Sequence, residues 1–328
     1  MFWAKNCQMD FTRRNRPALI LIISFLSWSG ISAEAPSFKP ESFAYVLQAD
    51  RLHKDRRKAV ELLRSCKRDL LILDHTYDGS AEAKWTAKEI RYIRACRPLR
   101  KIVSYISIGE AENYRTYWEK DWDANHDGRP GPSAPDYLLK VNPDWEGNYK
   151  VRYWDKRWQG LIMDYVDEII ELGFDGLYLD IVDGFEFFER EGDRQIDHRK
   201  NPATGNTYRQ DMIGFVQGIA AHVRKTKGQE FVIIPQNGAQ LLKDPGYLRV
   251  IDAIGIEDLF TDGDRKADGE HVRFMLSFLK KMEDAGKPVL VVEYPKKRAL
   301  KKHAVRRAEK QDFVLLLTER ELGSLGDR

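Results

Sequence analysis

The stretch "GFDGLYLDIVD" (residues 173–183) predicts a strand that is apolar on both faces and then stops at an acid. Leu177, Tyr178 and Leu179 would be buried on either face, and Asp180 follows them directly. Strands buried on both faces are typical of parallel sheets covered by helices. The acid therefore marks the carboxyl end of a strand, which is where parallel α/β folds place their binding sites.

Seven other apolar segments of strand length alternate with helical patterns along the chain. The predicted strands span residues 43–48, 69–77, 101–112, 175–183, 230–238, 250–258, 288–295 and 313–321, and the range 101–112 includes the loop that follows its strand. The predicted helices span residues 57–66, 87–96, 160–173, 211–226, 272–286 and 303–311. The alternation predicts an α/β fold, and eight strands predict a single (β/α)8 TIM barrel over residues 40–325. A doubly wound open sheet is the alternative, although no GxGxxG sequence follows the first strand.

The N-terminal segment has the order of charges and apolar residues that is typical of an export signal. Three arginines at positions 13, 14 and 16 precede the apolar run 18–25, and small residues then lead to Ala33. This order predicts a signal peptide over residues 1–33 and a periplasmic or secreted protein. An uncleaved membrane anchor is the alternative, but the run is short for a membrane-spanning helix. We expect no stable membrane insertion after the signal is cleaved.

Charge and cysteine content set further limits on partners and compartment. The 328 residues include 54 basic and 51 acidic side chains, so the net charge of +3 gives no indication of a nucleic-acid partner. We expect a monomer. Cys66 and Cys96 are the cysteines outside the predicted signal, and each lies at the end of a predicted helix. An exported protein allows them to form a disulfide, and two buried free thiols are the alternative.

Polar side chains stand at the end of nearly every predicted strand. In chain order they are Gln48, Asp50, Asp74, His75, Tyr77, Ser107, Glu110, Glu112, Asp180, Asp183, Gln236, Asn237, Glu257, Asp258, Glu293, Tyr294, Thr318 and Glu319. In a barrel these ends meet at one face, so the acids would line one cup. Acids packed together shift one another's pKa, so one can stay protonated while another is ionised, as glycoside hydrolysis requires. Asp183 and Asp258 would instead cap helices in the alternative interpretation.

The sequence gives little indication of a metal or an organic cofactor. It contains no HExxH, CxxC, GxSxG or P-loop sequence. Asp123, Asn125 and Asp127 match the first half of a calcium-binding loop, but its twelfth position is Ala134 where a glutamate is needed. We therefore expect a turn in this segment, with calcium as the weaker alternative, and no cofactor.

Four segments together resemble glycoside hydrolase family 114, the endo-α-1,4-polygalactosaminidases. They are "VSYISIGEAENYRTYW" (103–118), "NPDWEGNYKVRYWDKRWQ" (142–159), "GFDGLYLDIVD" (173–183) and "IGIEDLF" (254–260). The resemblance covers essentially the whole chain after the predicted signal. It implies a (β/α)8 barrel with catalytic carboxylates at the ends of strands four and six.

At the matching positions the resemblance implies Asp180 as nucleophile and Glu257 as general acid/base of a retaining hydrolase. The implied substrate is a partly deacetylated, α-linked galactosamine polymer, which is cationic and suits an acid-lined cup. The residues expected to contact it are the polar Asp74, Glu110, Asp183, Asn237 and Glu293 and the ring-stacking Tyr105, Tyr149 and Trp154. A carbohydrate-binding barrel without catalysis is the alternative, and it would not need the two carboxyls close together.

Overall fold

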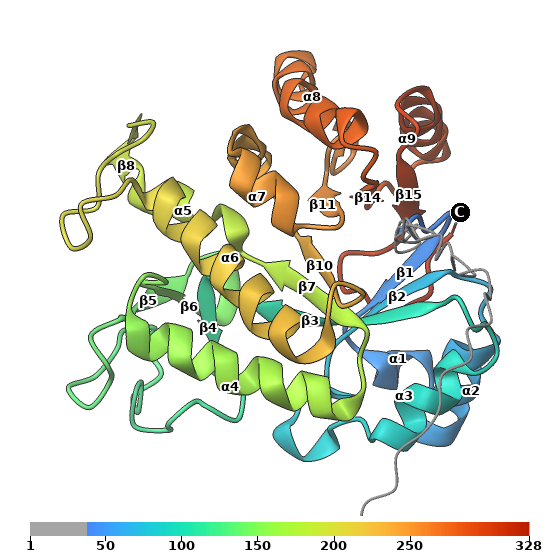
Figure 1. Cartoon of the computed structure of the whole chain (residues 1–328), viewed down its shortest axis with the longest axis horizontal. Helices are drawn as coiled ribbons and strands as arrows, with labels where there is room; N and C mark the ends of the chain where they lie inside the picture. Colours follow the sequence, from blue (N-terminus) through green and yellow to red (C-terminus); the bar gives the residue numbers. More distant parts are fainter. Residues whose placement is uncertain (1–37, 328) are drawn as a thin grey trace, which may run out of the picture. The chain divides into compact units, whose positions relative to one another are not determined.

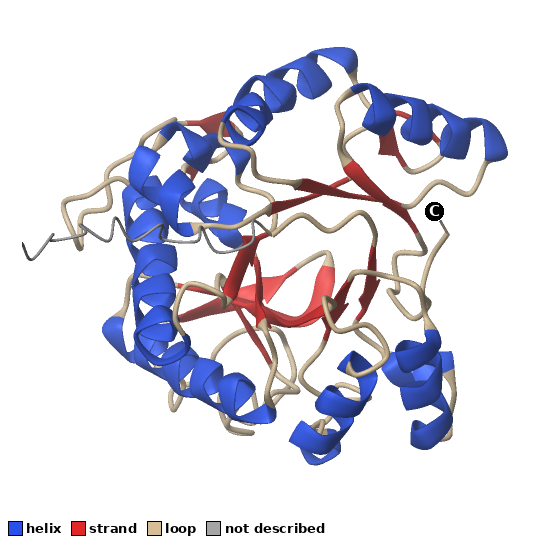
Figure 2. Cartoon of the chain, turned by 45° about the vertical axis from the view of Figure 1, so that its right-hand side comes forward, coloured by secondary structure: helices blue, strands red, loops and turns tan. Residues whose placement is uncertain are grey.

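Eight parallel strands run through the domain in chain order (Figures 1 and 2). The computed structural model describes residues 38–327, so the predicted signal peptide at 1–33 lies outside the described residues. One sheet has the order β1 (Phe43–Val46), β2 (Leu70–Leu73), β3 (Lys101–Ser107), β7 (Gly176–Asp180), β10 (Val232–Pro235). The second has the order β11 (Ile254–Glu257), β14 (Val289–Glu293), β15 (Val314–Leu317). All eight predicted strands are thus confirmed.

The two sheets are joined on one side by a single parallel bridge between Gln236 and Gly255. On the other side, no ladder pairs β15 with β1 among residues 38–327, although the amide of Leu47 donates to the carbonyl of Leu322 at 2.9 Å. The strands follow the order of a TIM barrel without a continuous ring of ladders. A doubly wound sheet would reverse its strand order near the first strand, so that alternative is wrong.

Helices follow the strands and lie outside the sheets, as Figure 2 shows. They are α1 (Ala49–Leu52), α2 (Arg56–Ser65), α3 (Ala87–Arg94), α4 (Lys156–Leu172), α5 (Phe185–Phe188), α6 (Tyr208–Lys227), α7 (Pro245–Val250), α8 (Gly269–Asp284) and α9 (Arg298–Lys310). Side-chain caps fix where several begin: Thr86 and Glu89 form a capping box on α3, and Asp268 accepts two amides of α8. Gly173, with φ of 86°, ends α4.

Alternating residues of each strand divide the core into two parts. One set packs in the interior between the strands, for example Tyr45, Val103 and Tyr178, while the other set packs against the helices. Gly255 makes room for this interior, because a Cβ there would lie 2.0 Å from the hydroxyl oxygen of Tyr178. The apolar character of both strand faces, visible in the sequence, follows from this double burial.

A small antiparallel sheet follows β3, and two of its strands lie in residues 113–159, where no strand was predicted. It has the order β4 (Glu110–Glu112), β6 (Trp145–Val151), β5 (Leu138–Asn142). The segment 101–112, predicted as the third strand with its following loop, divides at Gly109 into β3 and the short strand β4. A Cβ at Gly109 would lie 2.2 Å from the carbonyl oxygen of Ile181, so only glycine allows this close approach. The structure also contains two short hairpins. One pairs β8 (Arg190–Glu191) with β9 (Arg194–Gln195), and the other pairs β12 (Thr261–Asp262) with β13 (Arg265–Lys266).

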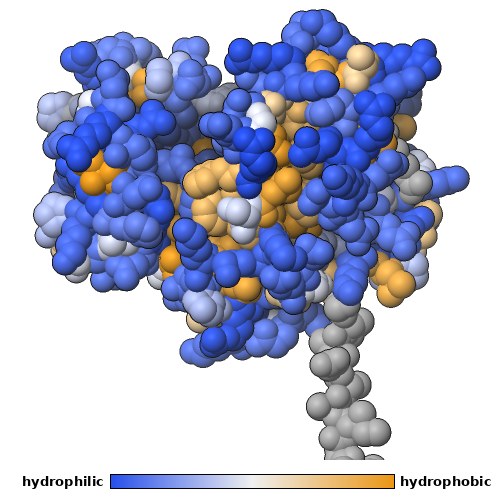
Figure 3. Space-filling model, turned by 90° about the horizontal axis from the view of Figure 1, so that it is seen from above, coloured by the Kyte–Doolittle hydropathy of each residue, from blue (hydrophilic) through white to orange (hydrophobic). Residues whose placement is uncertain are grey.

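The cysteines and the surface complete the description of the domain. Cys66 is half-buried and Cys96 is exposed, and both are free thiols rather than a disulfide. No helix within residues 38–327 combines the length and the hydrophobicity needed to cross a membrane. The face shown in Figure 3 is largely hydrophilic, with its largest group of hydrophobic side chains near the middle of the view and smaller ones elsewhere.

Candidate active site

Asp180 and Glu257 are the last residues of β7 and β11, and β10 is the one strand between them. The three strands are parallel, so both acids stand at the same end of the strands. Both side chains are half-buried. This arrangement gives two carboxylates that are partly removed from water and lie at the end of a parallel fold where binding sites form.

Asp180 has a hydrogen-bond donor for each oxygen. Its Oδ1 accepts the amide of Ile181 at 2.7 Å, and its Oδ2 accepts the hydroxyl of Tyr105 at 2.8 Å. Burial, followed by the charges of Glu257 and Asp183, nevertheless raises the pKa of Asp180 well above its usual value. The two hydrogen bonds lower that pKa but do not offset the burial and the neighbouring charges.

Glu257 is held in a similar way. Its Oε2 accepts the side-chain amide of Gln236 at 2.6 Å, and its Oε1 accepts the hydroxyl of Tyr294. Burial and the charge of Asp258 raise the pKa of Glu257, while the Tyr294 hydrogen bond lowers it. Both members of the pair therefore have raised pKa values, and the charge of Glu257 contributes to the rise at Asp180.

Three residues that follow the site strands adopt the left-handed backbone conformation. They are Ile181 after β7, Asn237 after β10 and Asp258 after β11, with φ of 56°, 60° and 52°. Residues other than glycine rarely adopt such angles, and those that do cluster at functional sites. Here the turns bring the Ile181 amide onto Asp180 and the Asn237 side-chain oxygen to 3.3 Å from the Glu257 amide.

Asp183 adds a third acid whose charge acts on Asp180, and Glu110 acts in turn on Asp183. Asp183 lies in the 3₁₀ helix Val182–Gly184, and burial together with the charge of Glu186 raises its pKa to about 7. Glu110 is fully buried, and one of its oxygens accepts Lys150 and, at 2.9 Å, Asn142. Its other oxygen makes no hydrogen bond to any residue that the structure describes. The charges of Lys150 and Glu110 both act on Asp183, so these groups form one cluster.

Asp74 and Glu293, which the sequence also predicts as substrate contacts, are buried and bonded to the protein. The oxygens of Asp74 accept Arg115 at 2.9 and 2.8 Å. Burial raises the pKa of Asp74, but the charge of Arg115 outweighs it and holds that pKa below its usual range. Glu293 accepts the amides of Phe260 and Thr261 at 2.6 and 3.0 Å, and burial raises its pKa to about 7. These positions favour support of neighbouring segments over direct contact with a substrate.

The three aromatic residues predicted to stack on sugars have polar or aromatic partners within the protein. The hydroxyl of Tyr105 bonds to Asp180. Tyr149 is buried, donates to Asp123, and packs on Trp118 with ring centroids 4.6 Å apart. Trp154 packs within a cluster of aromatic rings that also contains Tyr153, Phe188 and Tyr208. The aromatic rings that are nearly half exposed in this part of the chain are instead Tyr114 and Trp145.

The acidic segment 123–127 forms a hydrogen-bonded turn. Asp123 accepts the amides of Asp127 and Gly128 at 3.2 and 3.0 Å, and Asn125 donates to the Asp127 side chain at 3.1 Å. Over residues 38–327, the structure contains no group of three or more histidine, cysteine or acidic side chains placed to hold a metal. The Asp123 oxygens thus accept donors from their own turn and from Tyr149 on β6.

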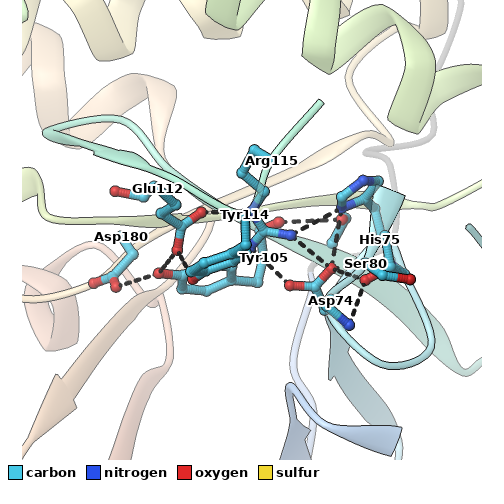
Figure 4. A network of polar contacts seen from close by, with 12 residues as sticks. Asp74, His75, Ser80, Tyr105, Glu112, Tyr114, Arg115 and Asp180 are labelled. Atoms are coloured by element: carbon cyan, nitrogen blue, oxygen red, sulfur yellow. Dashed lines mark hydrogen bonds and ion pairs between the residues drawn. The ribbon is translucent and has the colours of Figure 1, made fainter. Parts of the chain in front are cut away.

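A buried chain of polar contacts leads away from Asp180, as Figure 4 shows. Tyr105 also contacts Glu112 at 3.3 Å, Glu112 accepts Arg115 Nε at 2.6 Å, and Arg115 forms the ion pair with Asp74. The sequence predicted Glu112 only as a strand-end acid and did not identify Arg115 or Tyr114. A basic residue that follows an acid-rich strand end, as Arg115 follows "GEAENY", is the signal that points to such a buried pair.

A TIM-barrel-like parallel fold with paired acids at its strand ends is typical of glycoside hydrolases. The chain belongs to glycoside-hydrolase family GH114, whose family model matches residues 33–328.

Its relatives include uncharacterised proteins from Deinococcus radiodurans and Methanocaldococcus jannaschii. Each is 35% identical to this chain. The match to the Deinococcus protein covers 78% of this chain and 75% of that protein, and the match to the Methanocaldococcus protein covers 75% of this chain and 65% of that protein. Similar solved structures are the glycoside hydrolase domain of PelA from Pseudomonas aeruginosa and Ega3 from Aspergillus fumigatus in complex with galactosamine. Their TM-scores are 0.60 and 0.58 at 16% and 18% identity, covering 88% and 87% of this chain and 98% and 93% of theirs. They show the shared fold.

Proposed function

We propose that the protein is an exported glycoside hydrolase that cleaves an α-linked amino-sugar polysaccharide of the polygalactosamine type. The observation that carries this proposal is the pair Asp180 and Glu257, each with two hydrogen-bond donors, at the ends of β7 and β11 in a GH114 chain. Export rests on the predicted signal peptide at residues 1–33. We also infer that the two parallel sheets form one (β/α)8 barrel around this pair.

The proposed mechanism has two steps and retains the anomeric configuration. In the first, a carboxylate oxygen of Asp180 attacks the anomeric carbon, the glycosidic C–O bond breaks, and Glu257 gives its proton to the leaving oxygen. In the second, Glu257 takes a proton from water, the water oxygen bonds to the anomeric carbon, and Asp180 leaves as a carboxylate. Close carboxylates cannot both ionise easily, which keeps one proton in the pair at the pH where the enzyme works.

The charge around the pair supports a cationic substrate. The charge of Asp183 acts on Asp180, and Glu110, with Lys150 as its basic partner, acts in turn on Asp183. The free amine of a deacetylated galactosamine unit would neutralise part of this negative charge and form charge-assisted hydrogen bonds. The complex of Ega3 with galactosamine supports the same class of sugar.

The test compares two forms of α-1,4-galactosaminan, one partly deacetylated and one fully N-acetylated. We expect oligosaccharides, detected by mass, from the partly deacetylated polymer, and an α-anomer as the first product in ¹H NMR spectra. A first product in the β form would contradict retention. Equal cleavage of the fully acetylated polymer would contradict the role of the free amine.

A further inference from the structure

The hydroxyl of Tyr105 lies between two carboxylates (Figure 4). It donates to Asp180 Oδ2 at 2.8 Å and is 3.3 Å from Glu112 Oε1. A phenol has one O–H to donate, so it can serve one of these acids well at any moment. Burial and the charges of Asp180 and Glu112 raise the pKa of Tyr105 well above its usual value, so the hydroxyl keeps its proton.

Glu112 is a fixed second acceptor for this hydroxyl. Its Oε1 accepts the hydroxyl of Tyr114 at 2.6 Å, and its Oε2 accepts Arg115 Nε at 2.6 Å. The other end of the Arg115 guanidinium is bound by both oxygens of Asp74. Asp74, Glu112 and Arg115 are all buried, and His75 lies 3.0 Å from Asp74 in the same group.

The surroundings of Asp180 make this hydroxyl important. The charged and titratable groups that act on Asp180 or are acted on by it are Glu257, Asp183, Tyr45, Tyr178 and Tyr105. Among the described residues, Tyr105 supplies the one side-chain hydrogen bond to this carboxylate, and the Ile181 amide supplies the other donor. The largest charges acting on Asp180 are those of two further acids, so its ionised form depends on these two donors.

We propose that the Tyr105 hydroxyl alternates between Asp180 and Glu112 during the reaction, with Glu112 as a positioning residue. This inference rests on the proposed function. When Asp180 bonds to the anomeric carbon it becomes an uncharged ester, which is a weaker acceptor than the carboxylate of Glu112. The Tyr105 O–H bond stays intact, and its hydrogen rotates from Asp180 to Glu112.

The second half of the reaction reverses this rotation. As water displaces the ester, the electron pair of the breaking C–O bond returns to Asp180. The hydroxyl of Tyr105 then turns back and stabilises the departing carboxylate, because a hydrogen bond to an ionised acceptor is the stronger one. Glu112 meanwhile holds the hydroxyl within reach of Asp180 through the lifetime of the intermediate.

The arrangement is tested without substrate by titrating Asp180 in protein labelled with ¹³Cγ-aspartate, with Asp180→Asn to assign the signal. Tyr105→Phe removes a donor, so Asp180 should titrate at higher pH. In Glu112→Gln, the amide oxygen should face Arg115 and the NH₂ group should face Tyr105. An NH₂ group cannot accept the Tyr105 hydroxyl, so that hydroxyl stays on Asp180. The pKa of Asp180 should therefore fall, and Asp180 should titrate at lower pH. Tyr114→Phe frees Glu112 to attract Tyr105, so Asp180 should shift upward by less than in Tyr105→Phe.

Opposite shifts in Tyr105→Phe and Glu112→Gln are the result expected, and shifts in the same direction or no shifts would overturn the proposal. If Glu112→Gln fails to fold beside the buried Arg115, Tyr114→Phe decides the matter, because Tyr114 is 44% exposed and the substitution should not disturb folding. With polymer, Tyr105→Phe should slow the second step about tenfold and produce a burst of first product. If the titrations are as expected but the wild-type protein cleaves none of the tested polymers, the proposed function is overturned, and with it the alternation during the reaction. The hydrogen bonds shared by Tyr105 between Asp180 and Glu112 would then remain as the one supported part of the proposal.

Discussion

Asp180 and Glu257 show how two opposing effects act on a single carboxyl. Each accepts two hydrogen bonds, which favour the ionised form, yet burial and neighbouring acids raise the pKa of both. The result is a pair that can hold one proton at a pH where an exposed acid would be fully ionised. A proton held in this way is what the leaving oxygen of a glycoside needs.

Asp183 should control the acidic side of the pH–rate profile. Its charge raises the pKa of Asp180, so Asp183→Asn should let Asp180 ionise at lower pH. Because kcat/KM reports the free enzyme, its acidic limb should move to lower pH in this variant. Asp284→Asn, an exposed change on α8, is the matched control and should leave the limb in place. A limb that stays or moves upward in Asp183→Asn would show that Asp183 does not act on the nucleophile.

The sequence identifies the site acids better than it identifies their partners. Asp180 and Glu257 are predictable because a strand end is a local feature, visible where an apolar run stops. The side chain that donates to Asp180 is not predictable in this way, because Tyr105 precedes Asp180 by 75 residues and has the sequence pattern of any other buried strand residue. Arg115 and Tyr114 escape prediction for the same reason, because only folding brings them to Glu112.

Among the elements, the loops after β7, β10 and β11 determine how the site is shaped. Each loop contains a residue with positive φ close to the strand end. The loop after β11 has further support from β14, because Glu293 at the end of β14 accepts the amides of Phe260 and Thr261. Glu293 thus fixes the segment that follows Glu257, without needing contact with the substrate.

Glu293 should make the stability of the protein depend on pH. Burial raises its pKa from 4.5 to about 7 in the folded state, so between these values the folded protein binds more protons than the unfolded chain. The free energy of unfolding should therefore fall as the pH rises through this interval, by up to about 3 kcal/mol. Glu293→Gln should reduce that fall in urea titrations at pH 4.5 and 7, whereas Glu309→Gln, exposed on α9, should not. An equal fall in all three proteins would contradict this role.

The small sheet formed by β4, β5 and β6 was the element least visible in the sequence. Its strands are short, and the register between β5 and β6 shifts near Val141, which interrupts the alternation that indicates a strand. The consequence is functional, because β4 carries Glu110 and Glu112 and β6 carries Lys150. This small sheet therefore supplies part of the charge around the site.

Across the whole molecule, the number, order and direction of the strands were predictable, and their closure was not. Count and order follow from the alternation of apolar runs and helical patterns, which each segment shows locally. Closure depends on how neighbouring strands register, and β10 meets β11 through the single bridge at Gln236 and Gly255. The distribution of charge was likewise not predictable from composition, because the net charge of +3 does not show that acids gather at one end of the strands.

The measurement that tests the central claim most directly is oligosaccharide release from partly deacetylated α-1,4-galactosaminan, followed by mass spectrometry. Wild-type protein and the exposed variant Glu283→Gln should release oligosaccharides at the same rate. Asp180→Asn and Glu257→Gln should each lose more than about a hundredfold in rate while keeping the wild-type melting temperature. Full activity in both variants, or a wild-type protein that binds the polymer without cleaving it, would contradict the account.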